Sequence, residues 1–207
     1  MARSYYEIAF TDAVRDRQIA AGSAASYAKL LAPEAEPRDR FTAAEAEFVA
    51  ARDGFYMATV SATGWPYLQF RGGPRGFLKL LDARTLGFAD LRGNRQYVSA
   101  GNLDGNPRVA LFLMDYANRR RLKILGRARI VEAAEAPDLV QGLSAPGTEG
   151  RAERAVLIAL AGFDWNCSQH IPQRFTADEI TDLAARLQAE IAALRAENAR
   201  LREALER

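Results

Sequence analysis

Residues 69–82, QFRGGPRGFLKLLD, combine three cations with three glycines: Arg71, Arg75 and Lys79, with Gly72, Gly73 and Gly76. Glycine lets a backbone approach a ligand closely, and arginine and lysine side chains suit a phosphate or another anion. The stretch matches neither the GxxxxGK[ST] phosphate loop nor the GxGxxG dinucleotide fingerprint. A hairpin turn with solvated charges explains the same residues equally well.

A second polar stretch, DLRGNRQYVSAGNLDGNP at residues 90–107, lies between two apolar runs. It carries several hydrogen-bond donors over the length of one or two helical turns: Asn94, Arg95, Gln96, Ser99 and Asn102. Such donors suit a phosphate. The alternative is a polar connector that ends in the DGNP turn. Two such loops beside strands of one small barrel favour a phosphorylated ligand more than either loop alone.

Residues 163–175, FDWNCSQHIPQRF, hold the only cysteine and the only histidine of the chain. A nucleophilic pair requires Cys167 and His170 to meet, but Pro172 favours an irregular segment. The alternatives are that Trp165 and Ile171 pack on the barrel, with Cys167 as a small buried hydrophobe, or that the segment lines a cofactor. One cysteine and one histidine are too few for a closed zinc site, so we expect no bound metal.

The composition limits the class of protein. The 207 residues suit one main domain with an appendage, and 28 basic against 26 acidic residues give no indication of nucleic-acid binding. No apolar run approaches the roughly 20 residues of a membrane span, and the first residues lack the apolar core of a signal peptide. With a lone cysteine, these features predict a cytoplasmic protein without membrane contact.

The elements that must position these residues change from helix to sheet near residue 55. We expect a helix that ends at Gly22, and another that begins with a capping box of Thr42 and Glu45 and ends at Gly54. Residues 55–70 predict a hairpin that turns at Thr63-Gly64, and short runs follow at residues 76–82, 85–91, 108–116 and 120–133. Residues 151–165 fit a helix or a buried strand. The pattern predicts a mainly β protein with flanking helices, built on a small antiparallel barrel.

The last residues have a heptad pattern. The two apolar positions hold Ile180, Leu187, Leu194 and Leu201, and Ala184, Ile191, Asn198 and Leu205. The flanking positions hold Glu190 and Glu197 against Arg195 and Arg202. Opposite charges at this spacing and one polar core residue predict a parallel coiled-coil dimer. A surface helix packed on its own barrel is the alternative, and whether a coiled coil closes one dimer or joins two stays open.

The run from residue 66 to residue 133 resembles the FMN-binding split barrels related to pyridoxamine 5′-phosphate oxidase. The parts that match in order are Arg71 and Lys79, Gly87-Phe88, residues 94–96, Asn106-Pro107, residues 109–114 and residues 121–126. The resemblance implies a split β-barrel over residues 41–176. An N-terminal helical segment at residues 1–40 and the coiled coil at residues 177–207 would flank the barrel.

The resemblance also implies a homodimer with FMN at the subunit interface. Arg71 and Lys79 would lie along the phosphate and ribityl chain, with Gly72 close by. Asn94 and Arg95 would hold the phosphate, with Gln96 and Ser99 as further donors. Arg121 would lie near the flavin ring, which Trp165 and Asn166 would border. His170 and Arg174 would face the substrate.

Three departures from the oxidase pattern limit these implications. Arg121 stands where the oxidases have a glutamine. The spacing from Arg71 to Lys79 is longer, which leaves open whether Arg71 or Arg75 contacts the ligand. The Arg-Leu-His-Asp-Arg motif that engages the vitamin phosphate is missing, so vitamin oxidation is not implied.

We therefore expect an FMN-binding protein that acts as a flavin-dependent oxidoreductase on an unassigned substrate. The alternative is a non-catalytic flavin or small-ligand binding or sensor module with a coiled-coil interaction tail. A barrel with another cofactor, such as haem or a deazaflavin, is a third reading, and His170 as a haem ligand is its only support in the sequence.

Overall fold

The computed structural model describes residues 5–148, 150–165 and 168–205. The chain forms two compact units, Met1–Asp115 with Arg120–Ser168, and Tyr116–Arg119 with Gln169–Arg207. Within the described residues, none of the helices has both the length and the apolar character that a membrane crossing requires.

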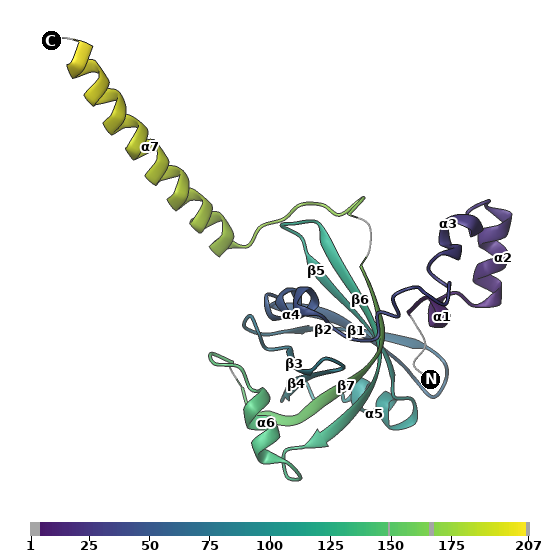
Figure 1. The fold of residues 1–207 in the computed structure, drawn as a ribbon. Coiled ribbons are helices and arrows are strands. Elements are labelled where there is room, and N and C mark those ends of the chain that lie inside the picture. The colour runs from purple at the N-terminus through teal and green to yellow at the C-terminus, as the bar shows by residue number, and fades with distance from the viewer. Residues whose placement is uncertain (1–4, 149, 166–167, 206–207) are drawn as a thin grey trace. The chain divides into compact units, whose positions relative to one another are not determined.

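A seven-stranded antiparallel sheet forms the first unit (Figure 1). The strands are β1 (Gly54–Val60), β2 (Pro66–Gly72), β3 (Lys79–Asp82), β4 (Thr85–Leu91), β5 (Arg108–Asp115), β6 (Arg120–Glu132) and β7 (Ala152–Trp165). Their spatial order is β2-β1-β5-β6-β7-β4-β3. The hairpin predicted at residues 55–70 is confirmed as β1 and β2. The ambiguous run at residues 151–165 is the interior strand β7, whose two neighbours are β6 and β4.

Helices flank the sheet. They are α1 (Tyr5–Ala9), α2 (Asp12–Ala20), α3 (Ala24–Ala28), α4 (Ala43–Ala50), α5 (Val98–Gly105) and α6 (Pro137–Leu143). The single helix expected to end at Gly22 is wrong, because Thr11 starts a second helix after α1. Gly54 does not end the next helix either, since α4 ends at Ala50 and Gly54 opens β1. The mainly β prediction with flanking helices is confirmed.

Alternating burial along the strands produces the main core. In β1 and β5 every second side chain faces inward, as expected for strands with one face on the core. Among the fully buried side chains are Phe55, Met57, Leu111, Leu113, Leu122, Ile124 and Ile158. A smaller apolar cluster around Val140 and Leu143 attaches α6 to the sheet.

A capping box fixes α4 to the end of β7. Glu45 accepts hydrogen bonds from Thr42 N at 2.9 Å and Thr42 Oγ1 at 2.6 Å, which confirms the predicted box. The same carboxylate accepts the indole Nε1–H of Trp165 at 2.7 Å. The Trp165 ring packs edge-on against Phe48, with centroids 4.7 Å apart. Glu45 is therefore a buried acid with a structural role, because its hydrogen bonds join α4 to the end of β7.

Tyr6 holds the N-terminal helices on β7. Its hydroxyl donates to Asp164 Oδ1 at 2.5 Å, and Arg38 Nη1 lies 2.8 Å from the same oxygen. Burial, followed by the bond to Asp164, raises the pKa of Tyr6 well above its ordinary value. Gly162 is required beside this contact, because a Cβ there would lie 2.8 Å from Tyr5 N.

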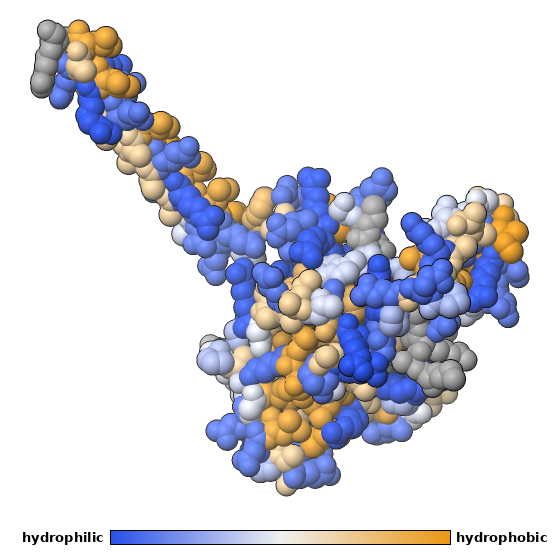
Figure 2. Space-filling view, in the orientation of Figure 1, coloured by the Kyte–Doolittle hydropathy of each residue, from blue (hydrophilic) through white to orange (hydrophobic). Residues whose placement is uncertain are grey.

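The second unit contains α7 (Ala177–Leu205), which begins with a second capping box. Thr176 N donates to Glu179 Oε2 at 2.8 Å, and Glu179 N donates to Thr176 Oγ1 at 3.2 Å. Its large apolar side chains are about half exposed or more, and Figure 2 shows hydrophobic residues recurring along the helix. A helix with such a stripe is typical of one that pairs with another helix.

The Glu45 anchor makes a prediction about stability. Replacing Glu45 with Gln can place the side-chain NH2 group, a donor, against the backbone N–H and the hydroxyl of Thr42, which are also donors. We therefore expect the free energy of unfolding to fall by about 2 kcal/mol at pH 7. Chemical denaturation measures this change. Glu47→Gln on the exposed side of α4 is the matched control and should change little.

Acid should reduce the difference in the free energy of unfolding between the wild type and Glu45→Gln. Burial alone raises the pKa of Glu45, but the hydrogen bonds from Thr42 and Trp165 outweigh burial and lower it overall. A lowered folded-state pKa stabilises the fold above the unfolded value of about 4.3, and this contribution is lost as the pH falls through the folded value. The wild type should thus approach Glu45→Gln in stability as the pH drops below about 4. A constant difference from pH 7 to pH 3 contradicts the assignment.

Candidate functional site

A cavity of about 210 Å³ lies where β2, β4, β7 and the start of α5 come together. Its charged lining residues are Arg71, Arg95, Arg154 and Asp90, which leaves an excess of two positive charges. Its polar lining residues include Gln69, Asn94, Gln96, Tyr97 and Ser99. We call this the cationic cavity. Its donors and its charge suit an anion such as a phosphate.

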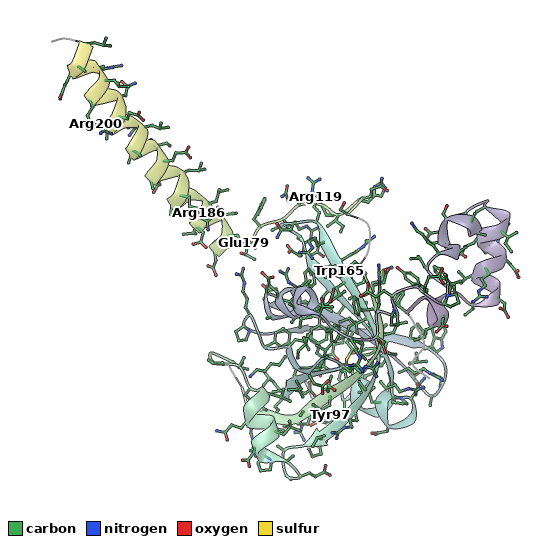
Figure 3. All side chains as sticks on the ribbon, viewed as in Figure 1. Tyr97, Arg119, Trp165, Glu179, Arg186 and Arg200 are labelled. Carbon is green, nitrogen blue, oxygen red and sulfur yellow. The ribbon has the colours of Figure 1, made fainter. Side chains whose placement is uncertain are left out.

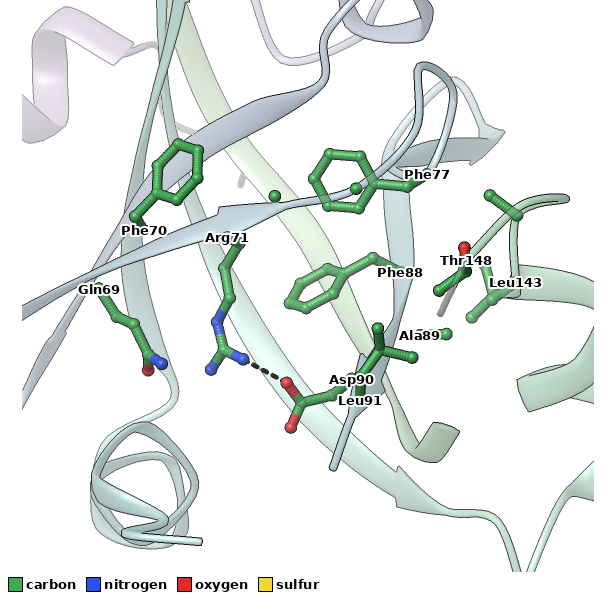
Figure 4. A pocket seen from close by; sticks show the side chains of 13 residues that line it. Gln69, Phe70, Arg71, Phe77, Phe88, Ala89, Asp90, Leu91, Leu143 and Thr148 are labelled. Carbon is green, nitrogen blue, oxygen red and sulfur yellow. Dashed lines mark hydrogen bonds and ion pairs between the residues drawn. The ribbon is translucent and has the colours of Figure 1, made fainter. Parts of the chain in front are cut away.

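Strand geometry places Arg71 in this cavity. Gln69 and Arg71 are two residues apart on β2 and so extend from the same face, as Figure 4 shows. Arg71 forms an ion pair with Asp90 of β4, and its guanidinium lies 5.8 Å from the centre of the Phe88 ring. Arg71 Nε is buried and has no hydrogen-bond partner in the described part of the chain. One donor of Arg71 is thus left for a ligand.

A second cavity, of about 190 Å³, shares Gln69, Arg71, Asp90 and Leu91 with the first. Its other walls include the rings of Phe77 and Phe88, Leu143 of α6, Gly72 and Thr148. We call this the aromatic cavity; the side chains that line it are drawn in Figure 4. The Arg71–Asp90 pair lines both cavities, so one ligand can contact that pair from either side.

Arg154 is the most buried cation of the site, with 8% of its surface exposed. Its Nη2 donates to Glu153 Oε2 at 2.9 Å, its Nε lies 3.6 Å from Asp90 Oδ2, and its guanidinium lies 4.8 Å from the centre of the Tyr97 ring. Burial alone lowers the pKa of Arg154, but these acidic neighbours outweigh burial and raise it. Arg154 therefore carries a permanent charge inside the protein.

The loop before α5 has an unusual backbone. Arg95 and Tyr97 have positive φ angles of 62° and 53°, a conformation that costs energy for residues with a Cβ. Asn94 Oδ1 accepts the backbone N–H of Gln96 at 3.1 Å, which stabilises the turn. The Arg95 side chain is exposed, and its hydrogen bond to Tyr97 raises its pKa. The loop thus presents Arg95 at the cavity mouth.

The structure brings together five of the predicted cofactor residues. Arg71, Asn94, Arg95, Gln96 and Ser99 all line the cationic cavity, and Gly72 lines the aromatic one. The hydroxyl of Ser99 already donates to Gln69 Oε1 at 2.9 Å, so Ser99 positions Gln69.

Other predicted residues lie outside these cavities. Lys79 Nζ donates to the backbone oxygen of Gly142 at 2.7 Å and lines neither cavity. Arg121 has a buried Nε without a partner among the described residues, and its guanidinium lies 5.9 Å from the Phe112 ring centre. Trp165 is bound to Glu45, and Figure 3 shows it well apart from Tyr97.

The remaining predictions fall beyond the first unit or on undescribed residues. Asn166 and Cys167 lie outside the described residues. His170 and Arg174 belong to the second unit, where His170 has a φ angle of 61° and the Arg174 guanidinium lies 5.1 Å from the Tyr116 ring centre. Their role on the substrate side stays a prediction.

Sequence reasoning missed four residues of the site: Gln69, Asp90, Tyr97 and Arg154. Asp90 and Arg154 are charges within strand-forming apolar runs, and such charges are rarely buried without a partner. That signal was available, but it does not say which charge pairs with which. Gln69 was identifiable only as the residue two before Arg71 on the same strand.

Comparison with known proteins decides the family. The family model for pyridoxamine 5′-phosphate oxidase matches residues 41–157, more than half of the chain. The chain belongs to the pyridoxamine 5′-phosphate oxidase family. This confirms the resemblance and, with the antiparallel sheet, the split-barrel fold class of this family. A search of curated proteins finds no match.

Solved structures with a similar fold include three with different names. HupZ of Group A Streptococcus is 15% identical over 65% of this chain and 100% of its own, with a TM-score of 0.47. An FMN-binding protein of Syntrophomonas wolfei is 9% identical over 72% of this chain and 97% of its own, with a TM-score of 0.47. An F420 reductase is 23% identical over 57% of this chain and 94% of its own, with a TM-score of 0.41.

Asp90 should control both the stability and the charge of the site. Replacing Asp90 with Asn leaves Arg71 and Arg154 without their shared carboxylate, so we expect the free energy of unfolding to fall by about 3 kcal/mol. Added sulfate should recover more stability in this variant than in the wild type, because Arg71 then has no acidic partner among the described residues and Arg154 keeps only Glu132 and Glu153. Thermal unfolding with and without sulfate measures both effects.

Asp104→Asn, on the exposed side of α5, is the matched control. It removes the same charge outside the cavity and should leave the sulfate response unchanged. An equal response of both variants to sulfate would count against a shared role of Asp90.

Proposed function

We propose that this member of the pyridoxamine 5′-phosphate oxidase family binds FMN and is a flavin-dependent oxidoreductase of unassigned substrate. The observation that supports FMN most is the pairing of two cavities around one ion pair. The cationic cavity offers arginines to a phosphate, and the aromatic cavity offers rings and apolar side chains to a flat ring system. FMN has both parts in one molecule.

The unpartnered donors of the site fit this ligand. Arg71 Nε and Arg154 Nε are buried donors without a hydrogen-bond partner in the described residues, and Arg71 and Arg154 both line the cationic cavity. Buried polar groups are nearly always hydrogen-bonded, so an anionic acceptor at this position removes a cost. Thr148 Oγ1, which is also unpartnered, lies at the aromatic cavity and suits a polar edge of a ring.

Residues of this chain would hold and orient the cofactor. Arg95, Asn94 and Gln96 would bind the phosphate from the α5 loop, while Arg71 would contact the chain between phosphate and ring. Bound FMN supplies hydride and electron transfer. The residues named here need not act as an acid, a base or a nucleophile; they neutralise charge and limit water around the ring. Lys79, Arg121, Trp165 and Asn166 stay predictions as cofactor contacts.

An apolar outer face supports the proposed homodimer. On β2, Leu68 and Phe70 are 62% and 58% exposed. Tyr56 of β1 lies opposite Phe70 on one side and opposite Phe112 of β5 on the other. Exposed apolar patches of this kind mark interaction surfaces. Because Arg71 follows Phe70 on this edge strand, a second copy bound here would lie next to the cofactor site. The cytoplasmic location remains a prediction from the sequence.

The α7 tail supports a second reading, a flavin-binding or sensor module that recruits a partner. A half-exposed apolar stripe is compatible with an enzyme and with a binding module. A measurement of catalytic activity is therefore needed to distinguish them. Reduction of the bound flavin by NADH or NADPH, followed by turnover of an acceptor, identifies an enzyme. A protein that binds FMN without cycling is a module.

The phosphate assignment can be tested at Arg95. Replacing Arg95 with Ala should weaken FMN by about tenfold or more, because a charge-assisted hydrogen bond to the phosphate is lost. The affinity for riboflavin, which has no phosphate, should fall little. Fluorescence titration of both ligands measures the difference. Arg129→Ala, an exposed arginine on β6 outside both cavities, is the charge-matched control. Equal losses of FMN and riboflavin would contradict the assignment.

The coiled-coil proposal is tested at Asn198. Replacing Asn198 with Leu removes the polar residue of the predicted core, so we expect a higher melting temperature or a changed oligomeric state. Analytical ultracentrifugation and thermal unfolding report both. Arg200→Leu adds the same side chain outside the predicted seam and is the control. If Asn198→Leu behaves like the wild type in both measurements, the buried-asparagine interpretation is wrong.

A further inference from the structure

A third cavity, of about 850 Å³, lies between the N-terminal helices and strands β5, β6 and β7. It shares no lining residue with the cationic and aromatic cavities. Its apolar lining residues are Ile8, Phe10, Val109, Leu125, Ala159, Leu160 and Ala161. We call it the N-terminal cavity. Its volume is within the roughly 300–1,000 Å³ of small-molecule sites.

A β-bulge shapes the floor of this cavity. Leu125 of β6 lies opposite Gly162, but the next residue, Gly126, lies opposite Leu160. Ala161 is thus left without a partner in the ladder and lines the cavity. A bulge bends its strand and re-aims side chains, and such irregularities are common beside binding sites.

The opposite wall is fixed rather than loosely packed. The hydrogen bond from Tyr6 to Asp164, at 2.5 Å, attaches α1 to β7 directly beside the cavity residues Glu7 and Ile8. Arg38 contacts the same carboxylate at 2.8 Å. Because these contacts are partly buried, the helices keep their place on the sheet. The cavity is therefore a built feature of the first unit.

Four arginines border the apolar floor: Arg15, Arg84, Arg108 and Arg127. Arg108 and Arg127 lie directly opposite each other on β5 and β6, and like charges in this position destabilise a sheet. Both are exposed, and within residues 5–148, 150–165 and 168–205 neither forms an ion pair. Arg84, in contrast, pairs with Asp39. Three carboxylates, Glu7, Asp12 and Asp39, also line the cavity, so its lining has one excess positive charge. Among the described residues none of the three forms an ion pair with Arg108 or Arg127, and these two adjacent cations remain without a bonded counter-charge.

We propose that the N-terminal cavity binds a small amphipathic anion, whose apolar body lies on the floor and whose carboxylate or phosphate lies between Arg108 and Arg127. An anion there relieves the repulsion between the two arginines and gains charge-assisted hydrogen bonds. Leu125, Leu160 and Ala161 bury the apolar body. The site is independent of the flavin cavities, so it can bind with or without FMN.

The test is calorimetric titration of the full chain with octanoate and with 1-octanol, which share an apolar chain and differ in charge. Octanoate should bind more tightly than octanol. The double variant Arg108→Gln, Arg127→Gln should weaken the binding of octanoate by about tenfold and leave the binding of octanol nearly unchanged. Arg129→Gln, on the same strand but outside the cavity lining, should change octanoate by less than about twofold.

A second variant keeps the test decisive. Ala159 is an exposed, small lining residue directly opposite Arg127, so Ala159→Trp should obstruct the floor beside that arginine and weaken octanoate binding by about tenfold without changing FMN affinity. Equal binding of octanoate and octanol, or equal losses in the double variant and Arg129→Gln, overturns the proposal. A wild type that binds neither ligand overturns it as well. So does a change of oligomeric state in the double variant, because a second copy then covers the cavity.

Discussion

The carboxylate of Asp90 is the interaction on which the candidate site depends. It lies between Arg71 from the edge strand β2 and Arg154 from the interior strand β7, and only about a sixth of the Arg71 and Asp90 side chains is exposed. Removing charges from water costs several kcal/mol unless they are paired. The pairing through Asp90 allows two arginines to lie below the surface, each with a donor left over, where an anionic ligand gains most from them.

The same arrangement explains why the two cavities form one candidate site. Arg71 lines both, so a ligand with a phosphate at one end and a flat ring at the other contacts the same guanidinium from either side. The positive φ angles of Arg95 and Tyr97 belong to the loop that presents the Arg95 cation at the cavity mouth. Strain of this kind persists only where the surrounding structure holds it, and it is concentrated at functional sites.

Two further regions have apolar surface that the first unit and the tail do not bury by themselves. The edge strand β2 exposes Leu68 and Phe70 next to the cofactor site, and α7 exposes a stripe along its length. Both are suited to a second copy of the chain, one through a sheet face and the other through a helical seam. The N-terminal cavity differs from both because it is a hollow with an apolar floor, and two of its bordering arginines, Arg108 and Arg127, form no ion pair within the described residues. This distinction separates an assembly surface from a small-molecule site.

Local patterns in the sequence determined most of the elements: alternation predicted the β1–β2 hairpin, Thr42 and Glu45 predicted the start of α4, and matching motifs predicted the family. The sequence also identified five of the donors of the cationic cavity, because these five occur in two compact stretches. Only the tertiary structure decided the partners of buried charges. Asp90 meets Arg154 because β4 pairs with β7, while Trp165 is bound to Glu45 and Lys79 to Gly142. Strand pairing between distant segments sets these contacts, and the periodicity of one segment holds no information about the register of another.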